Sequence, residues 1–142
     1  MRIKGTGKSE TIVGTDSADM IDGGAGNDTI IGGAGTDTLT GGRGADTFVF
    51  CANSQYDVVT DFNPAEGDRV LLDLGGSPNA PAYSGTLWDG LSFQTAGGTC
   101  TVHCVDFNGD GVMDTQLSIN GNNMFLLGCL PNELHGWDIL GG

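Results

Sequence analysis

Acidic residues recur every nine residues in the N-terminal part of the chain, and each stands two positions before an apolar residue. The acids are Glu10, Asp19, Asp28, Asp37 and Asp46, and the apolar residues are Ile12, Ile21, Ile30, Leu39 and Phe48. Carboxylates at a fixed spacing suit a hard cation that tolerates irregular geometry, with backbone carbonyls as further ligands. This donor set favours Ca²⁺ over Mg²⁺ or Zn²⁺.

Glycines accompany the acids in three consecutive nonapeptides, GGAGNDTII, GGAGTDTLT and GGRGADTFV, over residues 23–49. Glycine adopts positive φ and lets two backbones approach closely, as a short loop that reverses the chain requires. The candidate metal-binding positions are Asp19, Gly24, Gly26, Asp28, Gly33, Gly35, Asp37, Gly42, Gly44 and Asp46. A flexible Gly/Asp linker is the alternative, but a linker has no use for an apolar residue in fixed phase.

Two degenerate copies precede these repeats, GTGKSETIV at residues 5–13 and GTDSADMID at residues 14–22. They lack the second and fourth glycines, and Lys8 places a cation beside the first acid. Terminal repeats are usually atypical. The sequence therefore leaves two interpretations open: further calcium sites at Glu10 and Asp19, or copies that only cap the repeats.

Short strands joined by six-residue loops are the elements that must position these acids. One loop and one strand turn the chain by half a coil, so alternate repeats stack on opposite sheets. Ile12, Ile30 and Phe48 should then face Ile3, Ile21 and Leu39. The predicted fold is all-β, with a parallel β-roll (a β-solenoid) over residues 1–49. Its single row of aliphatic side chains is too thin to offset the entropy of ordering a glycine-rich chain, so calcium must stabilise it.

Residues 50–142 are predicted to form a C-terminal β-sandwich or roll that caps this first domain. Apolar–polar alternation predicts strands at about 47–51, 57–61, 69–73, 91–96, 99–105 and 123–127. Asp57 lies eleven residues after Asp46, which is one nine-residue repeat with a two-residue insertion. It is a candidate to complete the last calcium site, with Asp61 beside it. A solvated aspartate at a strand end is the alternative.

The segment DFNGDGVMD, residues 106–114, places acids and an amide at the spacing of an EF-hand loop. Its candidate ligands are Asp106, Asn108, Asp110 and Asp114. The bidentate acid of the twelfth position is replaced by Leu117, and the flanking residues alternate as strands do. The segment is predicted to be a hairpin turn, either without metal or with a weak additional calcium site.

The chain of 142 residues carries a net charge of −13, and its basic residues are Arg2, Lys4, Lys8, Arg43 and Arg69. Such a chain should not assemble a basic patch, so nucleic acid and anionic membrane surfaces are not expected as partners. No apolar run suits membrane insertion or a signal peptide. No zinc-protease motif and no activated nucleophile is present, so a non-catalytic module is expected.

Four cysteines, Cys51, Cys100, Cys104 and Cys129, allow three disulfide connectivities. Cys100 and Cys104 should share a strand, where residues four apart lie too far from each other to pair. Zinc binding together with His103 is disfavoured, because His103 should point to the opposite face of that strand.

The repeats, the continuation DTFVF…DVVTDF…GDRVLLDL and the terminal residues 137–140 resemble the C-terminal region of RTX (repeat-in-toxin) proteins. The chain is similar to the C-terminal domains of serralysin-type proteases and to the R-modules of mannuronan C5-epimerases. The resemblance implies several bound Ca²⁺ ions and a secreted bacterial protein, exported by a type I secretion apparatus without an N-terminal signal peptide. The terminal aspartate and apolar residues would belong to the secretion signal.

Two functions follow from this resemblance. In the first, the module folds on binding calcium outside the cell and supports the secretion and folding of a larger parent protein, which itself can be an enzyme. In the alternative, it binds a polysaccharide such as alginate, for which five scattered cations are few. A third hypothesis, an ice-binding surface formed by the recurring Thr11, Thr29, Thr38 and Thr47, is weakened by Met20 in the same column.

Overall fold

The computed structural model describes residues 1–51, 55–73, 85–95, 98–130, 133–134 and 138–140. Its described elements are short β-strands and one 3-10 helix, η1 (Pro64–Glu66). The strands of the N-terminal half are β1 (Arg2–Lys4), β2 (Thr11–Val13), β3 (Met20–Asp22), β4 (Thr29–Ile31), β5 (Thr36–Thr40), β6 (Thr47–Cys51), β7 (Tyr56–Val59) and β8 (Arg69–Asp73). Those that follow are β9 (Ser92–Thr95), β10 (Gly98–Val105), β11 (Asp114–Ile119), β12 (Asn122–Leu126) and β13 (Ile139–Leu140).

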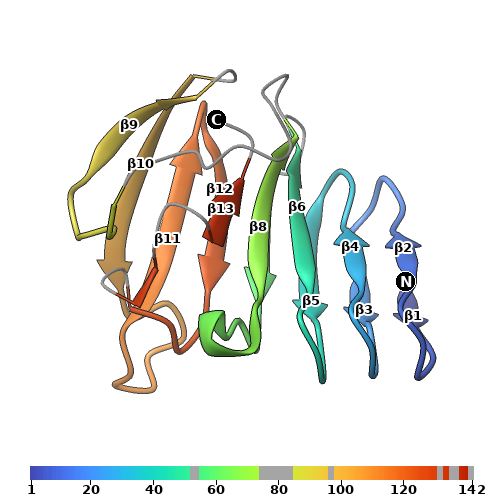
Figure 1. Cartoon of the computed structure of the whole chain (residues 1–142). Coiled ribbons are helices and arrows are strands. Elements are labelled where there is room, and N and C mark those ends of the chain that lie inside the picture. The colour runs from blue at the N-terminus through green and yellow to red at the C-terminus, as the bar shows by residue number, and fades with distance from the viewer. Residues whose placement is uncertain (52–54, 74–84, 96–97, 131–132, 135–137, 141–142) are drawn as a thin grey trace.

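Successive strands of the repeats alternate between two sheets, as the nine-residue period predicts (Figure 1). One sheet has eight strands in the order β1-β3-β5-β7-β12-β11-β10-β9. The other has five strands in the order β13-β8-β6-β4-β2. Strands β1 to β8 pair only in parallel, whereas β9 to β12 form antiparallel hairpins. The prediction of an all-β parallel roll followed by a β cap is therefore confirmed.

The core of the roll is the predicted double column of apolar residues. Ile12, Ile30 and Phe48 pair in register on the five-stranded sheet. Ile3, Ile21 and Leu39 do so on the eight-stranded sheet. All of these side chains are buried except the partly buried Ile3. Toward the C-terminus, aromatic side chains widen the core, and the Phe48 and Phe62 ring centroids lie 5.9 Å apart.

Both sheets run on from the roll into the cap. Strand β7 pairs in parallel with β5 on one side and with β12 on the other. Strand β6 pairs with β4 and β8, and its residues 47–51 span the expected domain boundary after residue 49. The same apolar layer therefore serves both parts of the chain.

The expected strands lie within two residues of their observed limits. Strand β7 ends at Val59 rather than at residue 61. Beyond it, the Thr60 N–H still donates to the Leu39 carbonyl, and the Asp61 side chain accepts from the Gly41 N–H of the neighbouring coil. The loop expected at residues 75–90 lies largely outside the described residues, as do Trp137 and the final glycines.

None of the four cysteines, all of which lie in the described part of the chain, forms a disulfide. Cys100 and Cys104 share β10, and His103 is exposed on the other face of that strand, as predicted. Burial raises the pKa of the Cys100 and Cys129 thiols to about 12. Within the described residues, no helix is both long and apolar enough to cross a membrane.

Candidate metal centre

Each repeat acid lies where a loop meets a strand, directly before the strand or, for Asp37, as the second residue of β5, so parallel stacking of the strands also stacks the acids. Two columns result, one with Glu10, Asp28, Asp46 and Asp68 and the other with Asp19, Asp37 and Asp57. In each step the backbone N–H of one acid donates to the Oδ1 atom of the acid one coil further on. The N···Oδ1 distances are 3.0, 2.9 and 2.8 Å in the first column and 2.9 and 3.2 Å in the second.

The Oδ2 atom is the part of the intact-repeat aspartates that is available to a metal ion. Asp28, Asp37 and Asp46 are 1%, 0% and 0% exposed. Their Oδ2 atoms accept no hydrogen bond from any residue that the structure describes. A buried carboxylate oxygen without a partner is costly unless a cation compensates it. These open carboxylate oxygens, two in one column and one in the other, therefore fit metal ions, and they are oxygen donors suited to Ca²⁺.

The pKa values of the column acids reflect the same burial. Burial, opposed in part by the Asp28 N–H and reinforced by the Asp68 carboxylate, raises the pKa of Asp46 to about 7. Burial also raises the pKa of Asp68 to about 6 and that of Asp37 above its usual range. A bound divalent cation would lower these pKa values again, since it favours the ionised carboxylate.

The loop glycines set the path of the backbone around these acids. Gly24, Gly33 and Gly42 have φ values of +85°, +90° and +85°, and Gly26, Gly35 and Gly44 have values of +92°, +94° and +109°. A Cβ atom on Gly42 would collide with the carbonyl oxygen of Gly24 in the preceding coil. Stacked loops thus bring a backbone carbonyl of one coil against a glycine of the next, and only glycine permits that approach.

The two degenerate loops have a different geometry. The Oδ2 atom of Asp19 accepts from the Thr15 N–H at 2.6 Å and from the Thr15 hydroxyl at 2.9 Å. The Thr15 N–H contributes most to a lowered pKa of Asp19, burial opposes it, and the Met1 amino group, 3.1 Å from Oδ1, and the Thr15 hydroxyl lower the pKa further. The Glu10 carboxylate similarly accepts a hydrogen bond from the Thr6 N–H. Both acids stand in the columns as predicted, but with protein partners on their carboxylates.

Asp57 continues the column of Asp37, with Asp37 and Asp57 as register partners, so the two-residue insertion was interpreted correctly. Asp61 does not lie beside Asp57 as expected. Its carboxylate accepts from the N–H groups of Gly41 and Gly42 at 2.9 and 2.8 Å. The reason is that β7 carries the chain across the roll, so that Asp61 reaches the loops on the Asp46 side.

Asp68 is the column member that sequence reasoning missed. Its Oδ1 accepts from the Asp46 N–H at 2.8 Å and its Oδ2 from the Asn63 N–H at 2.9 Å. A signal was present, because Asp68 stands two residues before the buried Val70, as Asp46 stands two residues before Phe48. The extra residues of the turn around η1 conceal it.

Residues 106–114 join β10 and β11 in an antiparallel hairpin, as predicted. Asp106 accepts from the N–H groups of Gly109 and Gly111, both at 3.0 Å. Buried Asp114 accepts from Phe107 N–H at 3.1 Å and Gly128 N–H at 2.6 Å. Asn108 and Asp110 accept from the N–H groups of Asp110 and Val112. These bonds account for the turn, and calcium binding here stays a prediction.

Among the described residues, no three His, Cys, Asp or Glu side chains converge as a preformed metal cage. Cys100, His103 and Cys104 are among the side chains that do not converge, with His103 exposed on β10. An ion between the stacked loops would instead need backbone carbonyls to complete its oxygen shell, which is ordinary for calcium.

A family model for the RTX calcium-binding nonapeptide repeat matches residues 5–39 and 13–48. Residues 5–48 are RTX calcium-binding repeats. The RTX β-roll is also similar to two solved subunits of the mannuronan C5-epimerase of Azotobacter vinelandii. With the AlgE6R2 subunit it shares 27% identity at a TM-score of 0.58, over 99% of this chain and 92% of that one. With the AlgE6R3 subunit it shares 25% identity at a TM-score of 0.56, over 96% of this chain and 80% of that one. A search of curated proteins found no match to the sequence.

Proposed function

We propose that this RTX β-roll is a non-catalytic folding module that calcium switches on. The buried Oδ2 atoms of Asp28, Asp37 and Asp46, which accept no hydrogen bond from the described residues, carry this proposal. Without a cation, these carboxylates must either repel one another or take up protons. With calcium between the loops, the same carboxylates become ligands.

The free energy of binding is then free energy of folding, because the unfolded repeats contain no preformed site. Extracellular calcium modules have dissociation constants of about 10⁻⁴–10⁻³ M, so such sites stay empty in the cytosol and fill outside the cell. A chain with these sites is unfolded where calcium is scarce and folded where calcium is abundant.

This difference suits export from the cell. We propose that the module belongs to a secreted bacterial protein and assists a type I secretion apparatus. The unfolded repeats thread through the transporter, and folding outside favours one-way passage. The RTX repeats and the similarity to epimerase subunits support an extracellular location.

A calcium titration followed by far-UV circular dichroism tests the switch. The expected result is a loss of β-structure in calcium-free buffer and its recovery in the range of about 0.1–1 mM Ca²⁺, with Mg²⁺ as the matched control ion. A chain that is fully β-structured in chelator and binds no calcium would overturn the proposal.

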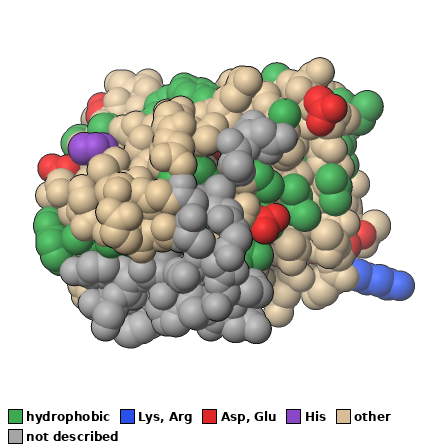
Figure 2. Space-filling model, turned by 90° about the horizontal axis from the view of Figure 1, so that it is seen from above, with side chains coloured by type: hydrophobic (Ala, Val, Ile, Leu, Met, Phe, Trp, Pro, Cys, Tyr) green, Lys and Arg blue, Asp and Glu red, His purple; other side chains and the backbone are tan. Residues whose placement is uncertain are grey.

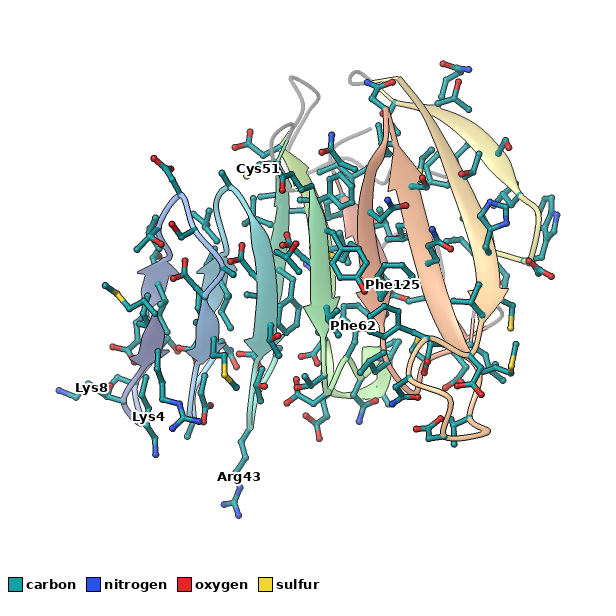
Figure 3. All side chains as sticks on the ribbon, turned by 180° about the vertical axis from the view of Figure 1, so that it is seen from behind. Lys4, Lys8, Arg43, Cys51, Phe62 and Phe125 are labelled. Atoms are coloured by element: carbon teal, nitrogen blue, oxygen red, sulfur yellow. The ribbon has the colours of Figure 1, made fainter. Side chains whose placement is uncertain are left out.

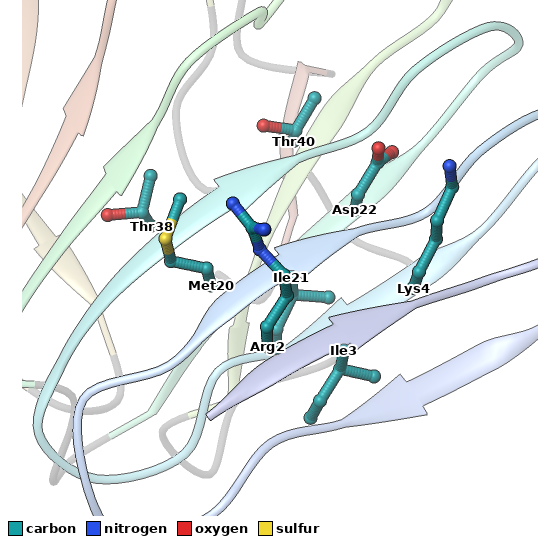
Figure 4. A pocket seen from close by; sticks show the side chains of 8 residues that line it. All are labelled: Arg2, Ile3, Lys4, Met20, Ile21, Asp22, Thr38 and Thr40. Carbon is teal, nitrogen blue, oxygen red and sulfur yellow. The ribbon is translucent and has the colours of Figure 1, made fainter.

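A second candidate function is binding of an acidic polysaccharide, and the placement of the basic residues favours it. Arg2 and Lys4 line a hollow of about 280 Å³ on the N-terminal coils, together with Met20, Asp22, Thr38 and Thr40 (Figure 4). Figure 3 shows Lys4, Lys8 and Arg43 on the lower loop edge of the roll, with Lys4 and Lys8 on the N-terminal coil and Arg43 on a later one. Stacking of the coils thus brings basic residues of different repeats to one part of the roll.

The distribution of acidic residues is compatible with such a ligand. Seen from above, acidic side chains form separate spots and a basic side chain projects at one end (Figure 2). The buried acids of the two columns add nothing to this surface charge pattern if calcium neutralises them. By analogy with the mannuronan epimerase subunits, the proposed ligand is a polyuronate.

Calorimetry with short oligouronates in calcium tests this second function. Heat of binding that disappears in the Arg2→Gln/Lys4→Gln variant supports it, and Arg69→Gln, on the other sheet, is the matched control. Absence of heat with the folded wild-type protein would exclude polyuronate binding without bearing on the calcium switch.

A further inference from the structure

The five repeat loops are of two kinds, distinguished by the residue at their second position. In loops 23–28, 32–37 and 41–46 this residue is a glycine with positive φ, and the loop acid has an Oδ2 atom that accepts no hydrogen bond from the described residues. In loops 5–10 and 14–19 it is Thr6 or Thr15, and the loop acid is bound by that threonine.

The backbone explains the difference. A β-branched residue strongly disfavours positive φ. Neither Thr6 nor Thr15 adopts it, since the described non-glycine residues with positive φ are Gln55 and Asn120. The two degenerate loops therefore follow another path, in which the threonine N–H points at the carboxylate. In the intact loop 23–28, the corresponding Gly24 N–H instead donates to Oδ1 of Asp22 at 3.0 Å.

The Thr15–Asp19 contact is the more complete of the two. The Thr15 hydroxyl lies 3.0 Å from Oδ1 and 2.9 Å from Oδ2 of Asp19, and the Thr15 N–H lies 2.6 Å from Oδ2. Charge-assisted hydrogen bonds of this kind hold a buried carboxylate without a metal. Asp19 is 3% exposed, and its charge is compensated by the Thr15 donors together with the Met1 amino group, which lies 3.1 Å from Oδ1.

We propose that Thr6 and Thr15 make the first coil a calcium-independent cap, in which Glu10 and Asp19 are bound by threonine and do not act as metal ligands. Calcium is then confined to the loops that carry a glycine at the second position. This inference refines the proposed calcium-binding function and rests on it.

The other end of the Asp28–Asp46 column supports the same inference. There the terminal acid, Asp68, is also fully engaged, with Asp46 N–H on Oδ1 and Asn63 N–H on Oδ2. The acids at both ends of this column thus accept hydrogen bonds from the protein. The Thr6 N–H donates to Glu10 at one end, and the Asn63 N–H donates to Asp68 at the other. The open oxygens lie on Asp28 and Asp46 between them.

Counting bound ions by native mass spectrometry tests the proposal. The double variant Thr15→Gly/Ser17→Gly restores the sequence GGDGAD, and we expect it to bind one more calcium ion per chain than the wild type. Ser17→Gly alone keeps Thr15 and is expected to show no gain. Asp19→Asn is expected to leave the wild-type count unchanged, whereas Asp37→Asn lowers it.

An unchanged count in the double variant, or a lower count in Asp19→Asn, would overturn the inference while calcium binding elsewhere persists. A wild-type chain that binds no calcium at all would instead refute the proposed function. Circular dichroism of each variant in excess calcium shows whether it has folded, so that a lost ion is not confused with a lost fold.

Discussion

At the scale of single residues, Asp46 combines the features of a metal ligand that is unfavourable without its metal. It is fully buried, and it lies among other carboxylates. We expect Asp46→Asn to weaken calcium-induced folding by about ten- to a hundredfold, since a lost charged ligand costs about 1.5–3 kcal/mol. The same substitution should increase β-structure in calcium-free buffer at pH 8, because the buried charge is removed.

The control for this variant is Asp16→Asn, which removes the same charge from an exposed loop position. Circular dichroism against calcium concentration measures both effects. Equal calcium midpoints for Asp46→Asn and Asp16→Asn would contradict the assignment of Asp46.

The raised pKa of Asp46 predicts how pH acts on the metal-free protein. Burial raises this pKa to about 7 in the folded chain, against 3.8 as its ordinary value. Between these two values the folded state binds more protons than the unfolded state. The penalty of the buried charge is therefore fully present above pH 7, and it is relieved as the pH falls toward 4.

Without calcium, urea denaturation at pH 8 and pH 5 should thus give a higher midpoint at pH 5. Asp46→Asn should reduce the difference. A midpoint that falls steadily on acidification would show that other carboxylates, stabilised by folding, dominate.

At the scale of loops and strands, the fold depends on the close stacking of glycine loops. We expect Gly42→Ala to destabilise the calcium-bound protein by at least about 1–2 kcal/mol, since its φ is +85° and a Cβ would meet the Gly24 carbonyl. Gly7→Ala is the matched control, because a Cβ there has nothing within 4 Å. It should change the free energy of unfolding by less than about 1 kcal/mol.

Thermal unfolding in excess calcium measures this pair of variants. An equal shift in both would mean that the loops adapt to a side chain, and that glycine is not required by the stacking seen here.

The turn after β7 makes a second prediction at this scale. Asp68→Ala leaves the N–H groups of Asp46 and Asn63 without their partner, and each unsatisfied buried group costs about 1–3 kcal/mol. Asp73→Ala, at an exposed position at the end of β8, is the control and should be nearly neutral. Urea denaturation in calcium compares them, and similar midpoints would remove Asp68 from the column.

At the scale of the whole molecule, the continuous sheets couple the cap to the calcium sites. Cys100 and Cys129 lie in the cap at 0% and 1% exposure, with thiol pKa values of about 12, so they should not react with a thiol reagent until the cap opens. We expect their protection to appear at the same calcium concentration as the circular dichroism signal of the roll.

A variant with Cys51→Ser and Cys104→Ser restricts this assay to the two buried thiols. If they are protected even in chelator, the cap folds independently, and the proposed division at residues 49 and 50 describes two separate folding units.

Much of the fold follows from the sequence because the repeat is local. A nine-residue period places each acid and each apolar residue at the same point of successive half-coils, so the columns of Ile12–Ile30–Phe48 and Asp28–Asp46 need no long-range information. The antiparallel hairpin around residues 106–114 follows from its turn residues for the same reason.

Only the tertiary structure decided the features that depend on where the period ends and on which coils become neighbours. Asp68 joins the column although the turn around η1 breaks the spacing, because strand pairing of β6 with β8 restores the register. Lys4, Lys8 and Arg43 lie along one loop edge of the roll because the coils stack (Figure 3). The path of each loop backbone determines where its N–H groups point. It therefore decides whether the loop acid is bound by the second residue of the loop, as with threonine, or keeps an open oxygen, as with glycine.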